Sequence, residues 1–451
     1  MADSVRMNEP VVNQRLGPLW LAPGIRRSHV LTKFWVTFVT IGMLSGASIL
    51  QGYILTEHLD IPRGQQGTVS GEISFWVEVV AILLFAPFGV LTDRIGRRPV
   101  YIGSMVFVAA GYALVPFATT ANELLAARLV FAVGMAGTAG TLATLTADYP
   151  REDSRGLMVG VTSMCNILGV IFIAGFVARI PLLLGERGFD PVTGGKAMYL
   201  FAAALGLLTV IVARLGLAPG TPAAKRDRPS TRSLIRSGLR HGRNPRIALA
   251  YAGSFAARAD LVIKGLFFAL WAIQDGFDRG MNPGEAMARF GIMLIIMNVV
   301  TLIAAPLFGL FIDRVNRVTA VIVALCFASV GYLSMGLITS PLDFAMVPYF
   351  IVISLGSGFM MKSSLSLVGQ EAPLRERGSV IAMAGMFGAI GILIFTKWGG
   401  ILFDAWGPWA PFVMAGAYQV VLLAAAIVVR IVAPGRAAPN PFFKRLAGAT
   451  E

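Results

Sequence analysis

Six ionisable side chains lie inside stretches of sequence that are otherwise apolar. They are Glu78, Arg128, Arg258, Asp260, Lys264 and Lys362. A charge inside an apolar stretch that is long enough to cross a bilayer is costly, and such residues mark pathways for substrates, ions or protons. Most of the six are cationic, so the sequence predicts a buried site that attracts anions. Arginine suits a carboxylate or a phosphate because its guanidinium offers two parallel donors.

Arg258, Asp260 and Lys264 share one apolar stretch, and helical geometry separates their directions. Asp260 and Lys264 are four residues apart, so they share a helix face and can form an internal pair. Arg258 points roughly 200° away from Asp260. It therefore needs another partner, a bound anion or water. The alternative is that Asp260 and Lys264 form a fixed structural pair and that Arg258 only extends toward the bilayer surface.

Glu78 has two interpretations. It lies at a depth similar to that of Arg128, and Lys397 falls near the same end of its own stretch. Glu78 is then either a proton site whose charge state depends on its neighbours, or half of a permanent salt bridge at the outer gate. All histidines fall in polar segments, so proton coupling would rest on Glu78 and Asp260.

Lys362 is surrounded by hydroxyl groups. Ser363, Ser364 and Ser366 follow it in the tenth apolar stretch. A serine-lined surface beside a lysine favours the wall of a hydrated cavity. Lys362 therefore joins the basic residues that we expect to contact a substrate.

The composition is that of a membrane protein. Hydrophobic residues make up 56% of the 451 residues, charged residues only 14%, and the mean hydropathy is +0.72. A water-soluble core could not hide this much apolar surface, so the net charge of +14 does not indicate a nucleic-acid partner. Both cysteines lie in apolar stretches, which predicts free thiols. The sequence carries no nucleotide-binding motif or metal-ligand cluster, so we expect neither an enzyme nor a cofactor.

Twelve apolar stretches each approach the roughly 20 residues that a spanning helix needs. They lie at 34–56, 72–92, 100–118, 124–147, 157–180, 198–218, 248–274, 288–310, 318–338, 344–369, 379–402 and 410–433. The longest polar gap divides them six and six. This pattern predicts an N-terminal segment (1–33), two helical bundles (34–218 and 248–433), a linker (219–247) and a tail (434–451).

The linker at 219–247 is strongly basic. Its charged residues are Lys225, Arg226, Arg228, Arg232, Arg236, Arg240, Arg243, Arg246 and the single acid Asp227. Two interpretations remain open, a cationic amphipathic segment on an anionic inner leaflet and a solvated linker. Most of the 38 Lys and Arg residues, Lys33 among them, fall on the side that holds both termini. This bias predicts cytoplasmic termini and a multi-pass protein of the cell inner (plasma) membrane.

A charged motif occurs once in each half of the chain. Gly89-Val90-Leu91-Thr92-Asp93-Arg94-Ile95-Gly96-Arg97-Arg98 recurs in weaker form as Gly309-Leu310-Phe311-Ile312-Asp313-Arg314-Val315-Asn316-Arg317. Each copy ends an apolar stretch. Internal repeats of this kind are typical of secondary transporters.

With twelve spans, a basic central loop and G-x-L-x-D-R-x-G-R-R after the second span, the chain resembles the major facilitator superfamily. The resemblance implies an all-α integral membrane fold with 12 transmembrane helices, in two six-helix bundles related by pseudo-two-fold symmetry. It also implies alternating access. Arg128 fits the family's second motif, whereas the fifth span lacks the Gly-Pro pair typical of drug/proton antiporters.

The resemblance gives the repeated motif a gating role. Asp93 would face the start of the eleventh helix near Gly378, and Asp313 the start of the fifth near Gly156, where exposed amides carry partial positive charge. These contacts would hold the inner gate shut. The remaining members of the motif and of its charge clusters are Gly89, Arg94, Arg97, Arg314, Arg317, Asp148, Glu152, Glu371 and Glu376.

Together these observations predict a monomeric secondary transporter that moves a small organic anion in symport with protons. The expected substrate ligands are Arg258, Lys264, Lys362 and Arg128, and the expected proton sites are Glu78 and Asp260. The first alternative is proton-coupled efflux of amphipathic drugs or lipids, which the many Phe and Met residues favour. A uniporter for neutral sugars and a transporter-like sensor are the others.

Overall fold

The computed structural model describes residues 14–219, 231–373 and 376–435, and most of them are helical. Predictions for residues 1–13, for Lys225, Arg226 and Arg228, and for the tail from residue 436 lie outside the described residues. The elements are β1 (Arg15–Leu16), β2 (Leu19–Trp20), α1 (Arg27–Ile49), α2 (Gln51–Tyr53), α3 (Arg63–Ile95), α4 (Arg97–Leu114), α5 (Ala121–Asp148), α6 (Arg155–Gly175), α7 (Ile180–Gly185), α8 (Pro191–Gly216), α9 (Thr231–His241), α10 (Pro245–Asp278), α11 (Pro283–Arg314), α12 (Arg317–Ser334), α13 (Val347–Glu371), α14 (Arg377–Trp406) and α15 (Ala410–Val432).

Eleven helical segments in the described part of the chain are long and apolar enough to cross a membrane. The twelfth long helix is α10, whose 34 residues include Arg258, Asp260 and Lys264. These charges lower its hydropathy, although its length suffices to span. Several helices run beyond their apolar stretches: the stretch at 72–92 lies within α3, Arg63–Ile95. The chain is a multi-pass membrane protein with the expected all-α fold.

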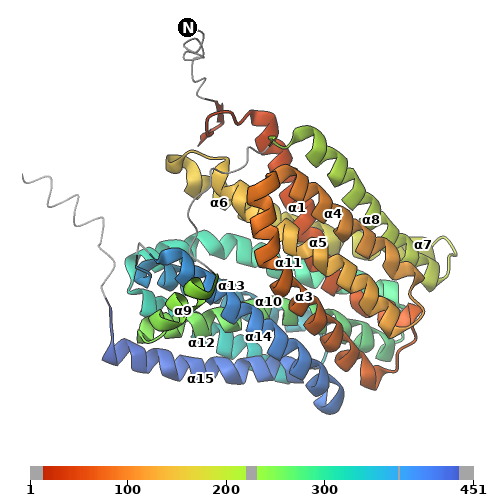
Figure 1. Cartoon of the computed structure of the whole chain (residues 1–451). Helices are drawn as coiled ribbons and strands as arrows, with labels where there is room; N and C mark the ends of the chain where they lie inside the picture. Colours follow the sequence, from red (N-terminus) through yellow and green to blue (C-terminus); the bar gives the residue numbers. More distant parts are fainter. Residues whose placement is uncertain (1–13, 220–230, 374–375, 436–451) are drawn as a thin grey trace, which may run out of the picture.

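The long helices form two bundles with matching internal contacts. In the first, α4 packs on α5 and α8, and α1 packs on α6; in the second, α12 packs on α13 and α15, and α10 packs on α14. Figure 1 shows the first bundle, from red to light green, at the upper right and the second, from teal to blue, below it. The equivalent pairings express the expected pseudo-two-fold relation.

The bundles meet at one end of the molecule, which we call the closed end. There, the backbone amides of Gly67 and Thr68 in α3 donate to the Asp404 carboxylate of α14 at 2.9 and 2.6 Å. Gln274 of α10 donates to the side-chain oxygen of Gln66 at 2.9 Å. Helix backbones also touch directly, because a Cβ on Gly71 would overlap the carbonyl oxygen of Thr396.

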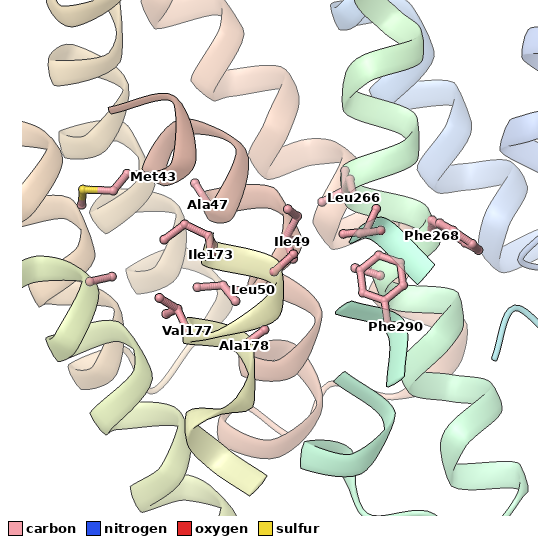
Figure 2. Close-up of a cluster of buried hydrophobic side chains, with 14 of the residues drawn as sticks. Met43, Ala47, Ile49, Leu50, Ile173, Val177, Ala178, Leu266, Phe268 and Phe290 are labelled. Carbon is pink, nitrogen blue, oxygen red and sulfur yellow. The ribbon is translucent and has the colours of Figure 1, made fainter. Parts of the chain in front are cut away.

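An apolar seam completes the closed end (Figure 2). Side chains of α1, of α6 and of the residues that directly follow these two helices lie on one side of it, and side chains of α10 and α11 lie on the other. The labelled members are Met43, Ala47, Ile49, Leu50, Ile173, Val177, Ala178, Leu266, Phe268 and Phe290, all of them buried. Burying such side chains from water or lipid makes this end a continuous packed layer.

At the opposite end, which carries Asp93 and Asp313 and which we call the motif end, the bundles separate. Phe85 of α3 and Leu307 of α11 are 57% and 65% exposed. A Cβ on Gly89 or on Gly309 would meet nothing within 4 Å. The hydrogen bonds and ion pairs by which Arg63, Gly67, Thr68, Gln274 and Lys397 join the bundles lie at the closed end. The two bundles therefore flank a central cleft that opens at the motif end.

Two short elements at the motif end were not predicted from the sequence. The hairpin of β1 and β2 leads to a bridge between Leu21 and Pro150, and the Trp20 amide donates to the Ser154 hydroxyl at 3.0 Å. In the linker, α9 docks on the second bundle, where the Tyr251 hydroxyl donates to the Gly238 carbonyl at 2.9 Å. Part of the linker is thus a docked helix, a form that neither interpretation of the sequence included.

Candidate functional site

Glu78 of α3 and Arg258 of α10 come from opposite bundles. The positive charge of Arg258 acts electrostatically on Glu78, but among the described residues Glu78 has no salt bridge within 4.0 Å. Glu78 is half-buried and Arg258 is exposed. The expected partners of Glu78 are engaged elsewhere: Lys397 lies 3.8 Å from Glu72, and Arg128 binds inside the first bundle. The constitutive pairing of Glu78 with Arg128 or Lys397 is therefore not formed.

One face of α10 presents Arg258 to the cleft. Arg258, Leu261 and Gly265 recur at helical spacing and are exposed or half-buried. A Cβ on Gly265 would lie 3.8 Å from the Cβ of Ser48 in α1. The stem of Arg258 lies along α14, where a Cβ on Gly388 would overlap it, and its Nη1 donates weakly to the Gly385 carbonyl at 3.5 Å. The glycines of α14 thus leave room for the arginine.

Asp260 and Lys264 point into the second bundle instead. Asp260 is 1% exposed, and Gln419 of α15 donates to both of its carboxylate oxygens at 3.0 Å. Lys264 donates to the Ser357 hydroxyl of α13. The two residues share a helix face as expected, and each acts on the other electrostatically, but each hydrogen-bonds to a different helix. The pair therefore ties α10 to α13 and α15.

Arg128 is buried in the first bundle, with 5% of its surface exposed. It donates to the Ala47 carbonyl and, at 2.8 Å, to the side-chain oxygen of Gln51. Helix α1 ends at Ile49 and α2 begins at Gln51, so Arg128 binds the backbone beside this break. Its guanidinium also lies 5.2 Å from the centre of the Phe131 ring.

Lys362 lies on the side of α13 that faces away from α12. On the opposite side Gly356 packs against Ala328 of α12, and Met360 and Ser363 are buried, whereas Lys362 is half-buried. In the described part of the chain it makes no hydrogen bond or ion pair. The structure therefore does not gather the four expected basic residues. Arg258 is exposed beside α14, and Lys362 lies on the face of α13 that also carries Gly358, which packs on Thr301 of α11. Arg128 and Lys264 are bonded within their bundles.

The motif end shows contacts within each bundle. Arg97 binds Asp148 at 2.9 Å, Arg317 binds Asp313 at 3.0 Å, and Arg246 rather than a motif arginine binds Glu371 at 2.9 Å. Arg94 and Arg314 are exposed, and Glu152 pairs with Arg155. A Cβ on Gly156 or on Gly378 would meet nothing within 4 Å. The gate contacts implied for Asp93 and Asp313 remain predictions.

Glu376, at the start of α14, anchors α9. It accepts hydrogen bonds from Ser237 and His241, and Arg240 lies 3.1 Å away. The hydrogen bonds from the Ser237 hydroxyl and His241, together with the nearby Arg240 charge, lower the pKa of Glu376 from 4.5 to about 2. Glu376 therefore belongs to the docked linker.

Lys33 was predicted to lie in the polar N-terminal segment, but the structure buries it completely between α1 and α6. Its ammonium group contacts Thr162 and the Met158 sulfur at 3.9 Å. The signal was weak because Lys33 directly precedes the first apolar stretch, and only the start of α1 at Arg27 reveals that it lies a turn and a half inside the helix.

Comparisons with known proteins agree with this architecture. A family model described as the Major Facilitator Superfamily matches residues 34–396 and 278–450. The chain is 27% identical to the magnetosome protein MamH of Paramagnetospirillum magneticum, over 88% of this chain and 90% of that protein. It is 25% identical to the tetracycline resistance protein, class E, of Escherichia coli, over 78% and 83%. The crystal structure of the nucleoside transporter NupG superposes with a TM-score of 0.70 at 17% identity, covering 88% and 98% of the two chains.

The two bundles, the repeated motif and the cleft define a membrane transporter. The chain belongs to the major facilitator superfamily, as the family model shows over most of its length. The structural likeness to NupG extends the agreement to the fold.

Proposed function

We propose that this protein carries a small organic anion across the plasma membrane by alternating access, in symport with protons. The observation that supports this most directly is Arg258, exposed on the cleft wall and opposed by a single half-buried acid, Glu78, from the other bundle. A guanidinium in this position can bind a carboxylate with two parallel hydrogen bonds. We propose that one chain suffices, because both walls of the cleft come from it.

The orientation follows from the distribution of charge. Arg94, Arg97 and Arg98 lie at the motif end, as does the basic helix α9, and basic residues collect on the cytoplasmic side of membrane proteins. The motif end is then cytoplasmic, both termini lie inside the cell, and the structure is open to the cytoplasm.

Coupling would arise from competition for Arg258. A substrate carboxylate that binds the guanidinium replaces Glu78 as its counter-charge, and Glu78 then holds the co-transported proton. Asp260, the other expected proton site, is fully engaged by Gln419. We therefore assign Asp260, Lys264 and Arg128 to holding each bundle rigid around the cleft.

Proton-coupled efflux of amphipathic drugs is the second candidate. The likeness to a tetracycline resistance protein favours it, as do the exposed apolar side chains along α3 and α11. In that case Glu78 would attract cationic compounds, and Arg258 would serve only to neutralise it.

The test is uptake into proteoliposomes of carboxylates, phosphates and cationic dyes, each with and without a pH gradient. We expect pH-dependent movement of an anion that Arg258→Ala abolishes. Arg430→Ala is the matched control, because Arg430 binds Thr319 at the outside of the second bundle. Movement of cationic dyes alone, with Arg258→Ala silent, would favour drug efflux instead.

A further inference from the structure

We propose that the outer face of α9 binds the headgroups of anionic phospholipids at the membrane surface. The proposal is independent of the substrate named above, because it concerns the rim of the second bundle and not the cleft. Three features support it: the side of α14 that α9 covers, the level at which α9 lies, and the unpaired charge on its outer face.

Helix α9 covers the side of α14 that faces lipid. A Cβ on Gly238 of α9 would lie 2.9 Å from the Cβ of Met383, so the two helices touch there. Ile394 lies three turns further along α14 on the same face as Met383, and Trp398 follows one turn later. Both side chains are exposed, at 44% and 57%, and they point roughly 200° away from Thr396, which touches α3. An exposed apolar face that points away from the other bundle meets the bilayer, so α9 lies at the lipid-facing rim.

The level of α9 is that of the membrane boundary. Its His241 contacts Glu376, which directly precedes α14, and its Gly238 meets Met383 in the second turn of α14. The spanning helix α10 begins at Pro245, four residues after α9 ends. Helix α9 therefore lies beside the ends of two spanning helices (Figure 1), where phospholipid headgroups surround a membrane protein.

The side chains of α9 divide into an inner and an outer face. Gly238 and His241 contact the second bundle. Arg236, Leu239 and Arg240 fall on the opposite face at helical spacing and are exposed. Arginines that flank an apolar side chain are typical of helices that lie among lipid headgroups. In this position the arginines reach the phosphates, and Leu239 reaches the upper part of the acyl chains.

Most of the charge on the outer face has no protein partner. Arg240 lies 3.1 Å from Glu376. Arg236, and Arg243 in the turn after α9, are exposed and make no hydrogen bond or ion pair in the part of the chain that the structure describes. A guanidinium binds a phosphate with two parallel hydrogen bonds, and each basic residue beside an anionic leaflet strengthens the attachment roughly fivefold. An anionic bilayer therefore complements this face in charge and already lies at its position.

The experiment measures which lipid lies beside α9. A fluorophore is attached to Leu239→Cys in the full-length protein without its native cysteines, and the protein is placed in nanodiscs of phosphatidylcholine mixed with phosphatidylglycerol. A nitroxide that quenches the fluorophore is carried on the acyl chains of one lipid or of the other. We expect labelled phosphatidylglycerol to quench at least about fivefold more efficiently than labelled phosphatidylcholine at equal content.

Variants show whether the arginines cause this preference. Arg236→Gln combined with Arg243→Gln should bring the two lipids to equal quenching, whereas Arg236→Lys combined with Arg243→Lys should retain the preference. Arg187→Gln combined with Lys196→Gln is the matched control, because it removes the same charge from exposed positions at the closed end. We expect this control to keep the preference, and all three variants to unfold at the same temperature as the parent protein.

Three results would overturn the proposal. Equal quenching by the two lipids in the parent protein would show that α9 does not select anionic headgroups. An absence of quenching by either lipid would show that its outer face meets water or another protein. A preference that survives the loss of Arg236 and Arg243, or that is lost equally in the control, would show that these arginines do not hold the lipid.

Discussion

The same two helices meet differently at the two ends of the molecule. At the closed end Asp404, near the end of α14, accepts hydrogen bonds from the first turns of α3, which has no side-chain cap of its own. At the motif end Asp93 lies near the end of α3, and a Cβ on Gly378 at the start of α14 would meet nothing within 4 Å. Because α3 and α14 are antiparallel, the carboxyl end of each helix lies at the end of the molecule where the other helix begins. We propose that Asp93 can close the motif end as Asp404 closes the other end, by placing a carboxylate beside a helix amino end, and that only one gate is closed at a time.

The two ends should differ most in how they tolerate a larger residue, and the largest effect is expected at Gly71, where the helix backbones touch. Gly71→Ala would push a methyl group into the Thr396 carbonyl, whereas Gly89→Ala at the motif end meets open space. We expect Gly71→Ala to be about 1–3 kcal/mol less stable than Gly89→Ala, since overpacking costs that much. Thermal unfolding in detergent measures the difference. Equal midpoints would show that the closed end is not tightly packed.

Loss of the Asp404 charge should release the closed end. In Asp404→Asn the helix start of α3 keeps an acceptor but loses the charge that complements its dipole, which is worth about 1 kcal/mol, or roughly fivefold in the conformational equilibrium. The readout is the rate at which a maleimide labels Ser74→Cys, on the α3 face that continues Gly67 and Gly71.

Asp343→Asn is the control for this prediction, because Asp343 caps only its own segment, at Ala345. Faster labelling in Asp404→Asn alone supports a gating role for Asp404. Equal labelling rates in Asp404→Asn and Asp343→Asn would show that Asp404 has no gating role.

Arg63→Ala should have a smaller effect at the same end. Arg63 and Asp278 form an ion pair between the bundles, but their side chains are 50% and 66% exposed. Exposed pairs contribute about 0.2–1 kcal/mol and weaken with salt. We expect a change in Ser74→Cys labelling of less than about fivefold that disappears at high ionic strength. If Arg63→Ala increased the labelling rate as much as Asp404→Asn does, the ion pair would not be the weaker of the two contacts.

At the motif end, the docking of α9 should not respond to pH in the physiological range. The pKa of Glu376 is lowered to about 2 from 4.5. The stability that its carboxylate gives to the docked α9 is therefore fully present above about pH 4.5 and is lost as the pH falls toward 2. A spin label on Leu239→Cys should stay immobile from pH 8 to pH 5 and gain mobility only in stronger acid. In Glu376→Gln it should be mobile throughout. A transition near neutral pH would show that another group holds α9.

The sequence predicted the elements of this fold better than the contacts between them. Apolar length and the repeated motif were enough to predict the helices and the family, and helical spacing was enough to place Arg258 opposite Asp260 on α10. The electrostatic effect of Arg258 on Glu78 was not predictable, because the two residues belong to different bundles. The contact of Asp404 with α3 was not predicted, because an acid at the end of a helix is common. Nothing in the sequence around Asp404 shows that the start of α3 lies beside it.

Reciprocal motion of the two ends is the central claim, and paired distances test it most directly. Spin labels on Gly64→Cys with Ala405→Cys report the closed end, and labels on Ile95→Cys with Gly378→Cys report the motif end. In reconstituted protein without its native cysteines, we expect Asp404→Asn to add a population with a longer closed-end distance and an equal population with a shorter motif-end distance. A closed end that lengthens while the motif-end distances stay unchanged would contradict alternating access through these two contacts.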